Sequence, residues 1–531
     1  MRAWQFALVL IAGCAHAASV AWPFDLLLAP GQPVWWLQLL AMVVLASQLN
    51  LATTKRQGAR LGWLFALSMQ LATWWWLFIS LHTYGGLAAP LAVLAIVGLA
   101  AFLALYYAAA GAVFVALAPV SWVGRAMLFA ALWLSAELCR VALFTGFPWG
   151  QGGYAQLDGP FIGLAKWVGV HGLTFGVALL GFAIAACLAR PRLLNLGLVS
   201  VCALAAAGGG AWEASEAASA NVPGAAPFTV TLLQGDIAQD EKFKPTGGLP
   251  DALQWYGKQM LAATSSLVIT PETALPILPE QLPDGYLDAL TNRFTKPAPG
   301  AASTAAMIGI PLGNSQAGYT NSVIALKPNT QPAIGGQSTV YQYDKHHLVP
   351  FGEFVHPLFK WFLRLVNIPL SDFNRGAVSQ PSFDWQGQRI APNICYEDLF
   401  GEELAARFID PSAAPTMMVN ISNIGWFGNT IAIDQHLNIS RMRAIEFERP
   451  MIRATNTGAT AIIDHTGRVT YSMPRHTRGV LTGVVRGRAG NTPYASWAAR
   501  FGLWPWWALV FAIILGAARA CIHWPKDRFY R

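Results

Sequence analysis

The chain has 531 residues, a formal net charge of +8, and a composition that is 54% hydrophobic but only 12% charged. About a quarter of the residues in soluble globular domains are charged, so this composition excludes a protein that is water-soluble throughout. The excess of Lys and Arg falls in loops between apolar segments. We therefore expect a membrane bilayer, and no nucleic acid, as the partner of this positive charge.

Apolar segments long enough to cross a bilayer, which takes about 20 residues, occur at both ends of the chain. We predict eight spanning helices, seven before a long polar region and one after it. The first is interpreted as an anchor and not as a cleaved signal peptide, because it lacks a strongly basic start and further spans follow. The eight segments are Trp4–Ala21, Val34–Leu51, Leu61–Leu81, Ala88–Leu105, Ala126–Phe144, Phe161–Leu188, Leu194–Ala211 and Phe501–Ala518.

Lys and Arg occur in alternate loops, which predicts the orientation of the helices in the membrane. The loops 23–33, 82–87 and 145–160 contain neither residue. The opposite ends of the spans carry Arg2, Lys55, Arg56, Arg60, Arg125, Arg190, Arg192, Arg519, Lys526, Arg528 and Arg531. An even number of spans then places both termini in the cytoplasm and the polar region on the outer side.

Three charged residues, Glu137, Arg140 and Lys166, lie within the predicted spans. Charges inside a membrane mark functional sites by default. The spacing of Glu137 and Arg140 fits a structural i, i+3 pair on one helix, and it equally fits contact with a phospholipid headgroup. A transporter or receptor with an outer binding domain would need more such charges, so these few favour an enzyme.

The polar region, residues 227–488, has a mixed composition with turns marked by Pro and Gly. Short β-rich runs alternate there with helical patterns, which predicts an α/β layered domain. The predicted strands are Thr229–Leu233, Ser266–Thr270, Ala306–Ile310, Ser322–Leu326, Thr339–Tyr343, Arg389–Ile394, Thr416–Ile421, Met451–Ala454 and Thr460–Ile463, and the predicted helices are Leu253–Thr264, Gly401–Phe408 and Ile433–Phe447. The other predicted boundaries are the bundle at 1–211, linkers at 212–226 and 489–500, the last span at 501–518 and a basic cytoplasmic tail at 519–531.

Three reactive residues of this domain, Glu272, Lys345 and Cys395, each come directly after a predicted strand. Because reactive groups gather outside the carboxyl ends of strands in α/β sheets, we expect these three to meet. Of the six cysteines, only Cys395 lies in this domain, which leaves it no disulfide partner there. His346 and His347 are adjacent and have no Cys or Asp cluster nearby, so we predict no metal site.

The three residue types suit acyl transfer to a thiol. A thiol needs a base or a nearby cation to become the nucleophilic thiolate at neutral pH. Glu272 could accept the thiol proton if partial burial raises the pKa of its carboxyl group. Lys345 could stabilise the oxyanion of a tetrahedral intermediate. Each residue taken alone has a simpler interpretation. Glu272 could be a charged turn residue, Lys345 a solvated lysine and Cys395 a buried core cysteine.

Together these segments resemble the carbon–nitrogen hydrolase (nitrilase) superfamily, and almost the whole chain is similar to the bacterial apolipoprotein N-acyltransferase family. The resemblance implies an α-β-β-α sandwich with a Glu–Lys–Cys triad, carried between seven N-terminal spans and one C-terminal span. It implies no cofactor and no metal. The motifs that carry it are Thr145–Trp149, Ser266–Pro276, Tyr343–Glu353, Pro392–Asp398, Asn423–Gly428 and Arg441–Glu446.

By this resemblance Glu272 is the general base, Lys345 supports the oxyanion and Cys395 is the nucleophile. The further positions that match are the supporting residues Glu353, Tyr396 and Glu397, and Phe243 as a lid or substrate contact. The chain departs from the family at Phe243 and Ile424, where the family often has Trp and Asp.

The resemblance also implies a reaction and a location. A phosphatidylethanolamine-like phospholipid would acylate Cys395 as a thioester. The α-amine of the N-terminal diacylglyceryl-cysteine of an apolipoprotein would then take the acyl chain as an amide. The location implied is the bacterial inner membrane, with the catalytic domain on the periplasmic side. The rival interpretation is a membrane-anchored nitrilase-like amidase that uses water instead of the amine, and the triad alone does not separate the two.

Overall fold

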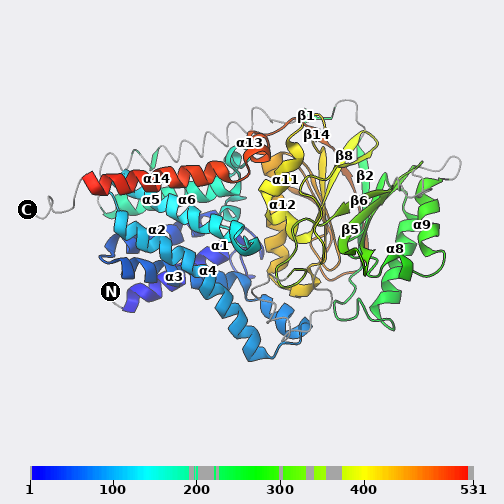
Figure 1. Ribbon diagram of the computed structural model, residues 1–531, viewed down its shortest axis with the longest axis horizontal. Coiled ribbons are helices and arrows are strands. Elements are labelled where there is room, and N and C mark those ends of the chain that lie inside the picture. Colours follow the sequence, from blue (N-terminus) through cyan, green and yellow to red (C-terminus); the bar gives the residue numbers. More distant parts are fainter. Residues whose placement is uncertain are drawn as a thin grey trace, which may run out of the picture. The chain divides into compact units, whose positions relative to one another are not determined.

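The computed structural model describes residues 3–189, 197, 199–200, 220–222, 227–297, 303–329, 340–354 and 373–523 (Figure 1). The chain forms two compact units. The helical unit comprises Met1–Phe78, Ala88–Ala217 and Phe501–Arg531, and the α/β unit comprises Ile79–Leu87 and Ala218–Arg500.

The helical unit is built from long apolar helices (Figure 1). Within the described residues, five segments are long and apolar enough to cross a membrane, and α2 is apolar but has 17 residues. The predicted seventh span, Leu194–Ala211, lies almost entirely outside the described residues, so the count of eight spans stays a prediction. The helices are α1 Ala3–Val20, α2 Trp35–Leu51, α3 Lys55–Trp74, α4 Ala89–Leu117, α5 Trp122–Ala142, α6 Ala165–Ala189 and α14 Trp504–His523. The membrane-length segments are Ala3–Val20, Ala89–Leu117, Trp122–Thr145, Ile162–Ala189 and Trp504–Ile522.

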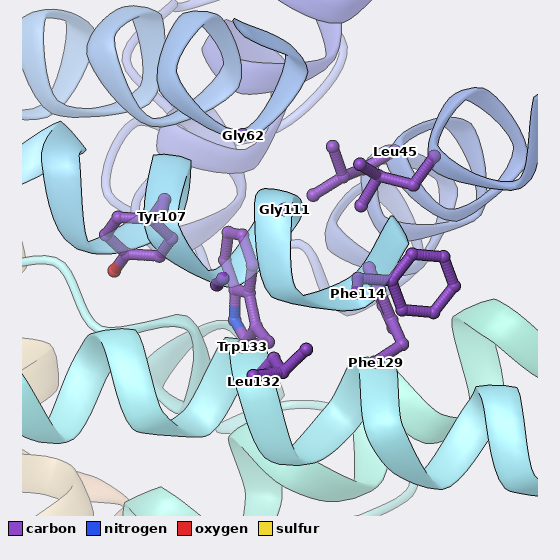
Figure 2. Close-up of a pocket in the computed structure, with 10 residues that line it drawn as sticks. Leu45, Gly62, Tyr107, Gly111, Phe114, Phe129, Leu132 and Trp133 are labelled. Atoms are coloured by element: carbon purple, nitrogen blue, oxygen red, sulfur yellow. The ribbon is translucent and has the colours of Figure 1, made fainter. Parts of the chain in front are cut away.

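Helices α3 and α4 approach closely because glycine lies at their contact. A Cβ atom at Gly58 would lie 2.3 Å from the backbone oxygen of Gly111, and one at Gly62 would lie 2.1 Å from that of Tyr107. Small residues four apart allow this kind of close helix crossing in membranes. Figure 2 shows a cavity beside the crossing, lined by residues of α2 to α5 that are apolar except for the Tyr107 hydroxyl and the indole nitrogen of Trp133. This lining provides apolar packing contacts and few polar groups that could take part in a reaction.

The loop 145–160 is predicted as an outer connection, but the structure buries residues 148–157 among the helices. Buried backbone groups need hydrogen-bond partners. The Gly152 N–H donates to Glu137 Oε1 at 3.1 Å, and the Gly152 oxygen accepts from Gln38 Nε2 at 2.7 Å. Arg140 Nη2 donates to the Trp149 oxygen at 2.6 Å. Polar side chains of the helices therefore support this loop.

These contacts favour a structural role for Glu137 and Arg140. The role differs from the predicted i, i+3 pair, because each side chain binds the backbone of the loop. Arg140 is 1% exposed, and its guanidinium also donates to the Phe147 oxygen and the Tyr107 hydroxyl, both at 3.2 Å. Contact with a lipid headgroup would need an exposed guanidinium.

We expect Arg140→Met to lower the melting temperature in detergent. The variant removes the guanidinium that donates to the Trp149 and Phe147 oxygens and to the Tyr107 hydroxyl, and a hydrogen bond from a charged group contributes about 1.5–3 kcal/mol. Intrinsic tryptophan fluorescence during heating measures the effect. The exposed Arg60 of α3 provides a matched control, since Arg60→Met should melt like the wild type. Equal melting temperatures for the two variants would contradict the supporting role of Arg140.

The α/β unit contains two six-stranded sheets, ordered β13-β2-β3-β4-β5-β6 and β12-β11-β10-β9-β8-β7. The strand runs β2–β3–β4 and β8–β9–β10 are parallel, and the outer pairs are antiparallel. The strands are β2 Phe228–Gln234, β3 Leu267–Ile269, β4 Ala305–Asn314, β5 Gly318–Leu326, β6 Tyr341–Asp344, β7 Phe383–Trp385, β8 Gln388–Ile394, β9 Met417–Ser422, β10 Met451–Thr455, β11 Ala461–Ile463, β12 Val469–Ser472 and β13 Gly479–Val485. Two short strands, β1 Ala220–Asn221 and β14 Arg488–Ala489, form a separate antiparallel pair.

The two sheets pack face to face around one apolar core, to which the first sheet contributes Val230 and Ile269 and the second Ile394 and Ile421. The outer face of the first sheet packs against α8 and α9, and that of the second packs against α11, α12 and α13 (Figure 1). This arrangement confirms the predicted α-β-β-α sandwich. The helices are α8 Gly248–Ala262, α9 Tyr286–Thr295, α11 Gly401–Ala405, α12 Ala432–Phe447 and α13 Pro493–Phe501.

Each predicted strand and helix of this unit overlaps an observed one, but several observed elements are not predicted. Strands β12 and β13 were missed because most of their side chains are exposed or half-buried, so they lack the apolar pattern of the central strands. The stretch 489–500 is predicted as a linker, but the structure places most of α13 there. Tyr494 and Ala495 of that helix are fully buried in the core under the second sheet.

The segment Ile79–Leu87 packs on the α/β unit, although α3 and α4 on either side of it do not belong to that unit. It begins with a π-helix, η1 (Ile79–Tyr84). Ser80 Oγ donates to the Trp426 oxygen at 2.7 Å, and the rings of Tyr84 and Trp426 meet edge to face with centroids 5.8 Å apart. The third span is predicted to continue to Leu81, but α3 ends at Trp74. The loop after β9 thus contacts the segment that connects α3 and α4.

Candidate active site

The ends of three strands bring the predicted site residues together. Glu272 lies in the turn after β3, Lys345 directly follows β6, and Cys395 directly follows β8. Strands β3 and β6 belong to one sheet and β8 belongs to the other. The site therefore forms where the two sheets of the sandwich meet.

The ammonium group of Lys345 is the centre of the site. Its side chain is fully buried, and Nζ lies 3.1 Å from Glu272 Oε1 and 2.9 Å from Glu353 Oε2. Asn321 Nδ2 donates to the same two carboxylates, at 2.7 Å to Glu272 and 2.8 Å to Glu353. Glu272 Oε2 also accepts the Asn423 N–H at 2.9 Å. Both carboxylates are thus held in fixed positions.

These contacts set the charges of Glu272 and Lys345. Burial disfavours the charged form of Glu272, but Lys345, Asn321 and Lys242 outweigh it and hold the pKa of Glu272 below its ordinary value. Burial likewise opposes the charge on Lys345, but Glu272 and Glu353 raise the pKa of Lys345 above its ordinary value. The condition that the pKa of Glu272 is raised is therefore not met, because the two ammonium groups and Asn321 outweigh the effect of burial. Glu272 is ionised and available at neutral pH, but it is a weak base.

Cys395 has a strained backbone at the junction of β8 and the 3-10 helix η7 (Cys395–Leu399), with φ at +51°. A non-glycine residue in this left-handed region costs roughly 1–3 kcal/mol and persists only when its surroundings hold it there. The Cys395 backbone oxygen accepts from Asn420 Nδ2 at 3.1 Å and lies 3.2 Å from His436 Nε2. Side chains of two other elements therefore fix the turn that carries the thiol.

The charges around the Cys395 thiol keep it protonated. Burial and the negative charges of Glu272 and Glu353 raise the pKa of the thiol well above its ordinary value, and Lys345 offsets only part of this effect. The resting site thus contains a neutral thiol beside an ionised carboxylate.

A buried polar network supports the turn that carries Cys395. His436, Asp398 and Arg453 are fully buried. Arg453 Nη2, which can only donate, lies 3.1 Å from His436 Nδ1, so the ring hydrogen of His436 is on Nε2. That hydrogen faces Asp398 Oδ1 at 3.0 Å and the Cys395 oxygen at 3.2 Å. A neutral histidine, oriented by an Asp–Arg ion pair, therefore contacts the Cys395 backbone.

Among the supporting residues, Glu397 links the thiol segment to the lysine segment. Its carboxylate accepts the N–H groups of Ile394 and His346, both at 2.6 Å. Burial raises the pKa of Glu397, although these N–H groups favour its charged form. Because Ile394 precedes Cys395 and His346 follows Lys345, the side chain of Glu397 fixes the two reactive residues relative to each other.

The two aromatic candidates differ in exposure. Tyr396 is buried, and its ring centroid lies 5.4 Å from that of Phe400 and 5.7 Å from that of His347. Phe243 is 37% exposed, and its ring centroid lies 6.0 Å from Lys242 Nζ. Tyr396 is thus a packing residue of the turn that carries Cys395, whereas part of the Phe243 ring remains exposed.

Several residues that contact the predicted triad are not identified from the sequence, among them Lys242, Asn321, Asn420, Asn423 and His436. Asn423 directly follows β9, so the rule that singles out residues at strand ends also applies to it. Asn321 lies inside β5, and Lys242 lies in a turn far from any strand end. No local pattern indicates that their side chains meet Glu272.

The adjacent histidines already have partners. His346 Nδ1 lies 2.7 Å from the Gly376 oxygen, and His347 Nδ1 lies 2.9 Å from Glu403 Oε1. Over the described ranges of the chain, no group of three or more His, Cys, Asp or Glu side chains is placed to hold a metal ion.

Family models match both units. The carbon-nitrogen hydrolase model matches residues 229–494, and the model of the apolipoprotein N-acyltransferase N-terminal domain matches residues 18–183. A solved carbon-nitrogen hydrolase from Helicobacter pylori is similar at 14% identity and a TM-score of 0.34, covering 57% of this chain and 99% of that chain. The α/β unit is thus a carbon-nitrogen hydrolase domain joined to an apolar helical unit.

Relatives match along almost the whole chain. An apolipoprotein N-acyltransferase from Verminephrobacter eiseniae is 54% identical over 94% of this chain and 94% of that protein. One from Ralstonia nicotianae is 43% identical over 87% of this chain and 85% of that protein. One from Bordetella bronchiseptica is 41% identical over 97% of both. The chain therefore belongs to the apolipoprotein N-acyltransferase family.

We expect Lys345→Met to destabilise the α/β unit in a pH-dependent way. The variant leaves Glu272 and Glu353 buried without their ammonium partner, and breaking a buried pair costs about 3–5 kcal/mol. Burial then raises the pKa of Glu272, so lowering the pH from 7 to 5 protonates the carboxylate and restores part of the lost stability. In the wild type the pKa of Glu272 is below its unfolded value of 4.5, so this group loses its stabilising effect only at still lower pH.

Melting temperatures at pH 7 and pH 5 test this expectation. The surface variant Lys258→Met corrects for other titrating groups, since Lys258 is exposed. The melting temperature of Lys345→Met should rise relative to Lys258→Met on acidification. A parallel decrease in both variants would refute the assigned ion pairs.

Proposed function

We propose that this acyltransferase moves an acyl chain from a phospholipid to the N-terminal amine of a lipoprotein, through a thioester on Cys395. The observation that carries the proposal is the group formed by Lys345, Glu272 and Glu353, with the Cys395 thiol within its electrostatic reach. The match to apolipoprotein N-acyltransferases along the whole chain supports the choice of substrates.

In the first half-reaction the thiol attacks the ester carbonyl of the phospholipid. The Cys395 proton passes to Glu272, the sulfur–carbon bond forms, and the positive charge of Lys345 stabilises the oxyanion. When the ester carbon–oxygen bond breaks, the leaving alkoxide takes the proton back from Glu272 and departs as a lysophospholipid. The thioester on Cys395 remains, and Glu272 is ionised again.

In the second half-reaction a neutral α-amine attacks the thioester carbonyl. The nitrogen–carbon bond forms, Glu272 takes a proton from the amine, and the carbon–sulfur bond breaks. The proton then returns to Cys395, so the site ends in its resting charge state and the product is an amide. An α-amine has a pKa near 8, so a useful fraction of the acceptor is neutral at physiological pH.

The apolar helical unit suits lipid substrates at both steps. Each CH₂ group moved from lipid into water costs about 0.8 kcal/mol, so a soluble enzyme would extract a two-chain lipid at prohibitive cost. The exposed ring of Phe243 is an apolar surface for an acyl chain near the site. We further propose that the protein lies in the inner membrane with the α/β unit on the periplasmic side and both termini in the cytoplasm. The alternation of Lys and Arg between loops supports this orientation.

We expect a thioester on Cys395 after incubation with phosphatidylethanolamine in detergent. Mass spectrometry of the digested protein should find one acyl group on the Cys395 peptide, released by neutral hydroxylamine, together with lysophospholipid. The Cys395→Ala variant should melt like the wild type and form neither product. Cys14, Cys139, Cys187 and Cys521 serve as internal controls. An acyl group on one of these, with none on Cys395, would overturn the proposal.

We expect the acylated enzyme to react with amines much faster than with water. A lipopeptide with a free diacylglyceryl-cysteine α-amine should discharge the thioester within the assay time, because the amine is the nucleophile of the second step. The same lipopeptide with an acetylated amine should leave the thioester in place. Equal release of free fatty acid with both peptides would instead identify a membrane-anchored hydrolase.

A further inference from the structure

A second lysine is buried beside the base and has no part in the mechanism above. Lys242 lies in the turn region after β2 and is 1% exposed. Its Nζ donates to the Glu272 backbone oxygen at 3.1 Å and to Thr273 Oγ1 at 2.7 Å. Among the described residues, no carboxylate oxygen lies within hydrogen-bonding distance of this ammonium.

These two hydrogen bonds hold a strained turn. Thr273 has φ at +47°, a left-handed conformation that a β-branched residue rarely adopts. The turn directly follows β3 and sets the direction of the Glu272 side chain. Lys242 therefore fixes the base through its backbone.

The same segment holds the carboxylate of Glu272 from a second side. Gln239 Oε1 accepts Asn423 Nδ2 at 2.7 Å, and the Asn423 N–H donates to Glu272 Oε2 at 2.9 Å. Two side chains three residues apart, those of Gln239 and Lys242, thus reach both flanks of the base. Phe243, the exposed aromatic candidate, comes next in the chain.

The positive charge of Lys242 neutralises the net negative charge of Glu272, Glu353 and Lys345. Two carboxylates, Glu272 and Glu353, face one ammonium, Lys345, so this group has a formal charge of −1. A net negative group opposes formation of a thiolate or an oxyanion next to it. Lys242 interacts electrostatically with both Glu272 and Cys395, and its positive charge brings the formal sum of these four side chains to zero. Asp398 and Arg453, which also act on Cys395, form an ion pair with each other and leave this sum unchanged.

An apolar side chain would be the more stable occupant if packing were the only need at this position. A buried ammonium bound to only a carbonyl and a hydroxyl is costly, because charged groups lose strong hydration on burial. Burial accordingly lowers the pKa of Lys242 to about 8. The lysine is still mostly charged at neutral pH and loses its proton as the pH rises through this value.

We infer that Lys242 is a positioning residue of the acyl-transfer site, which fixes the Glu272 turn and supplies a second positive charge beside Glu272 and Cys395. The inference rests on the proposed function, since the charge matters only if Cys395 becomes anionic during the reaction. It adds to that function a role for the segment 239–242.

Alkylation of Cys395 by iodoacetamide tests the inference without any lipid. The rate, followed by mass spectrometry of the Cys395 peptide from pH 6 to pH 10, reports the thiolate fraction. Lys242→Met should react more slowly than the wild type at pH 6 to 7, about tenfold for each unit by which the thiol pKa rises. The ratio of the two rates should fall toward one above about pH 8, where the wild-type lysine also becomes neutral.

Three further variants separate charge from shape. Lys244→Met removes an exposed lysine of the same segment and should leave the alkylation profile unchanged. Lys242→Arg keeps the charge and should restore much of the rate at pH 7. Thr273→Val removes the hydroxyl acceptor but not the charge, so it should slow acyl transfer without shifting the pH profile. Melting temperatures establish that each variant is folded.

A wild-type rate and pH profile in folded Lys242→Met would overturn the inference. So would a rate ratio that stays constant from pH 6 to pH 10, because a purely structural effect does not titrate with Lys242. Failure of the proposed function would look different: the wild type would be alkylated at Cys395 but would form no thioester with phospholipid.

Discussion

One buried ammonium group holds the candidate site together. Lys345 has no exposed surface, and its two carboxylate partners come from different segments, Glu272 from the turn after β3 and Glu353 from the segment after β6. Separation of such a buried pair costs several kcal/mol, so neither carboxylate is free to turn away. Asn321 bridges the two carboxylates. The charges therefore have fixed positions before a substrate binds, and this preorganisation is what makes electrostatic stabilisation of a transition state effective.

Cys395 and Glu272 also have similar backbone surroundings. Each lies at a left-handed, non-glycine turn after a strand: Cys395 itself has a positive φ directly after β8, and Thr273, next to Glu272, has one in the turn after β3. A strained turn keeps its shape only when other elements hold it. His436 contacts the backbone oxygen of Cys395, and Lys242 binds Thr273 and the backbone of Glu272. The polar residues around the triad thus stabilise its backbone as well as its charges.

The sequence was sufficient to predict those features that follow from local patterns. Strand ends are readable from apolar runs, and this is why the strands before Glu272, Lys345 and Cys395 overlap the observed ones. Contacts between distant elements are not readable in this way. Asn321 lies in the middle of a strand, and the burial of the loop 145–160 depends on polar side chains from separate helices.

Contacts between distant elements also explain why the pKa of Glu272 is lowered and not raised. Burial alone does raise the pKa of a carboxyl group. The two lysines that reverse the effect are 30 residues before and 73 residues after Glu272 in the chain. Local sequence indicates how deeply a side chain is buried much better than it indicates which charges surround that side chain.

The charge balance also explains how a reactive thiol can remain inert until its substrate arrives. In the resting site the pKa of Cys395 is raised and that of Glu272 is lowered, so proton transfer between them is uphill from both sides. Since the thiolate is the form that oxidants and electrophiles attack, the empty site protects its sulfur. In the proposed mechanism proton transfer is coupled to formation of the sulfur–carbon bond, so that the negative charge moves from sulfur to the carbonyl oxygen. Under that mechanism, the carboxylates that raise the pKa of the free thiol favour reaction only with a carbonyl group already in place.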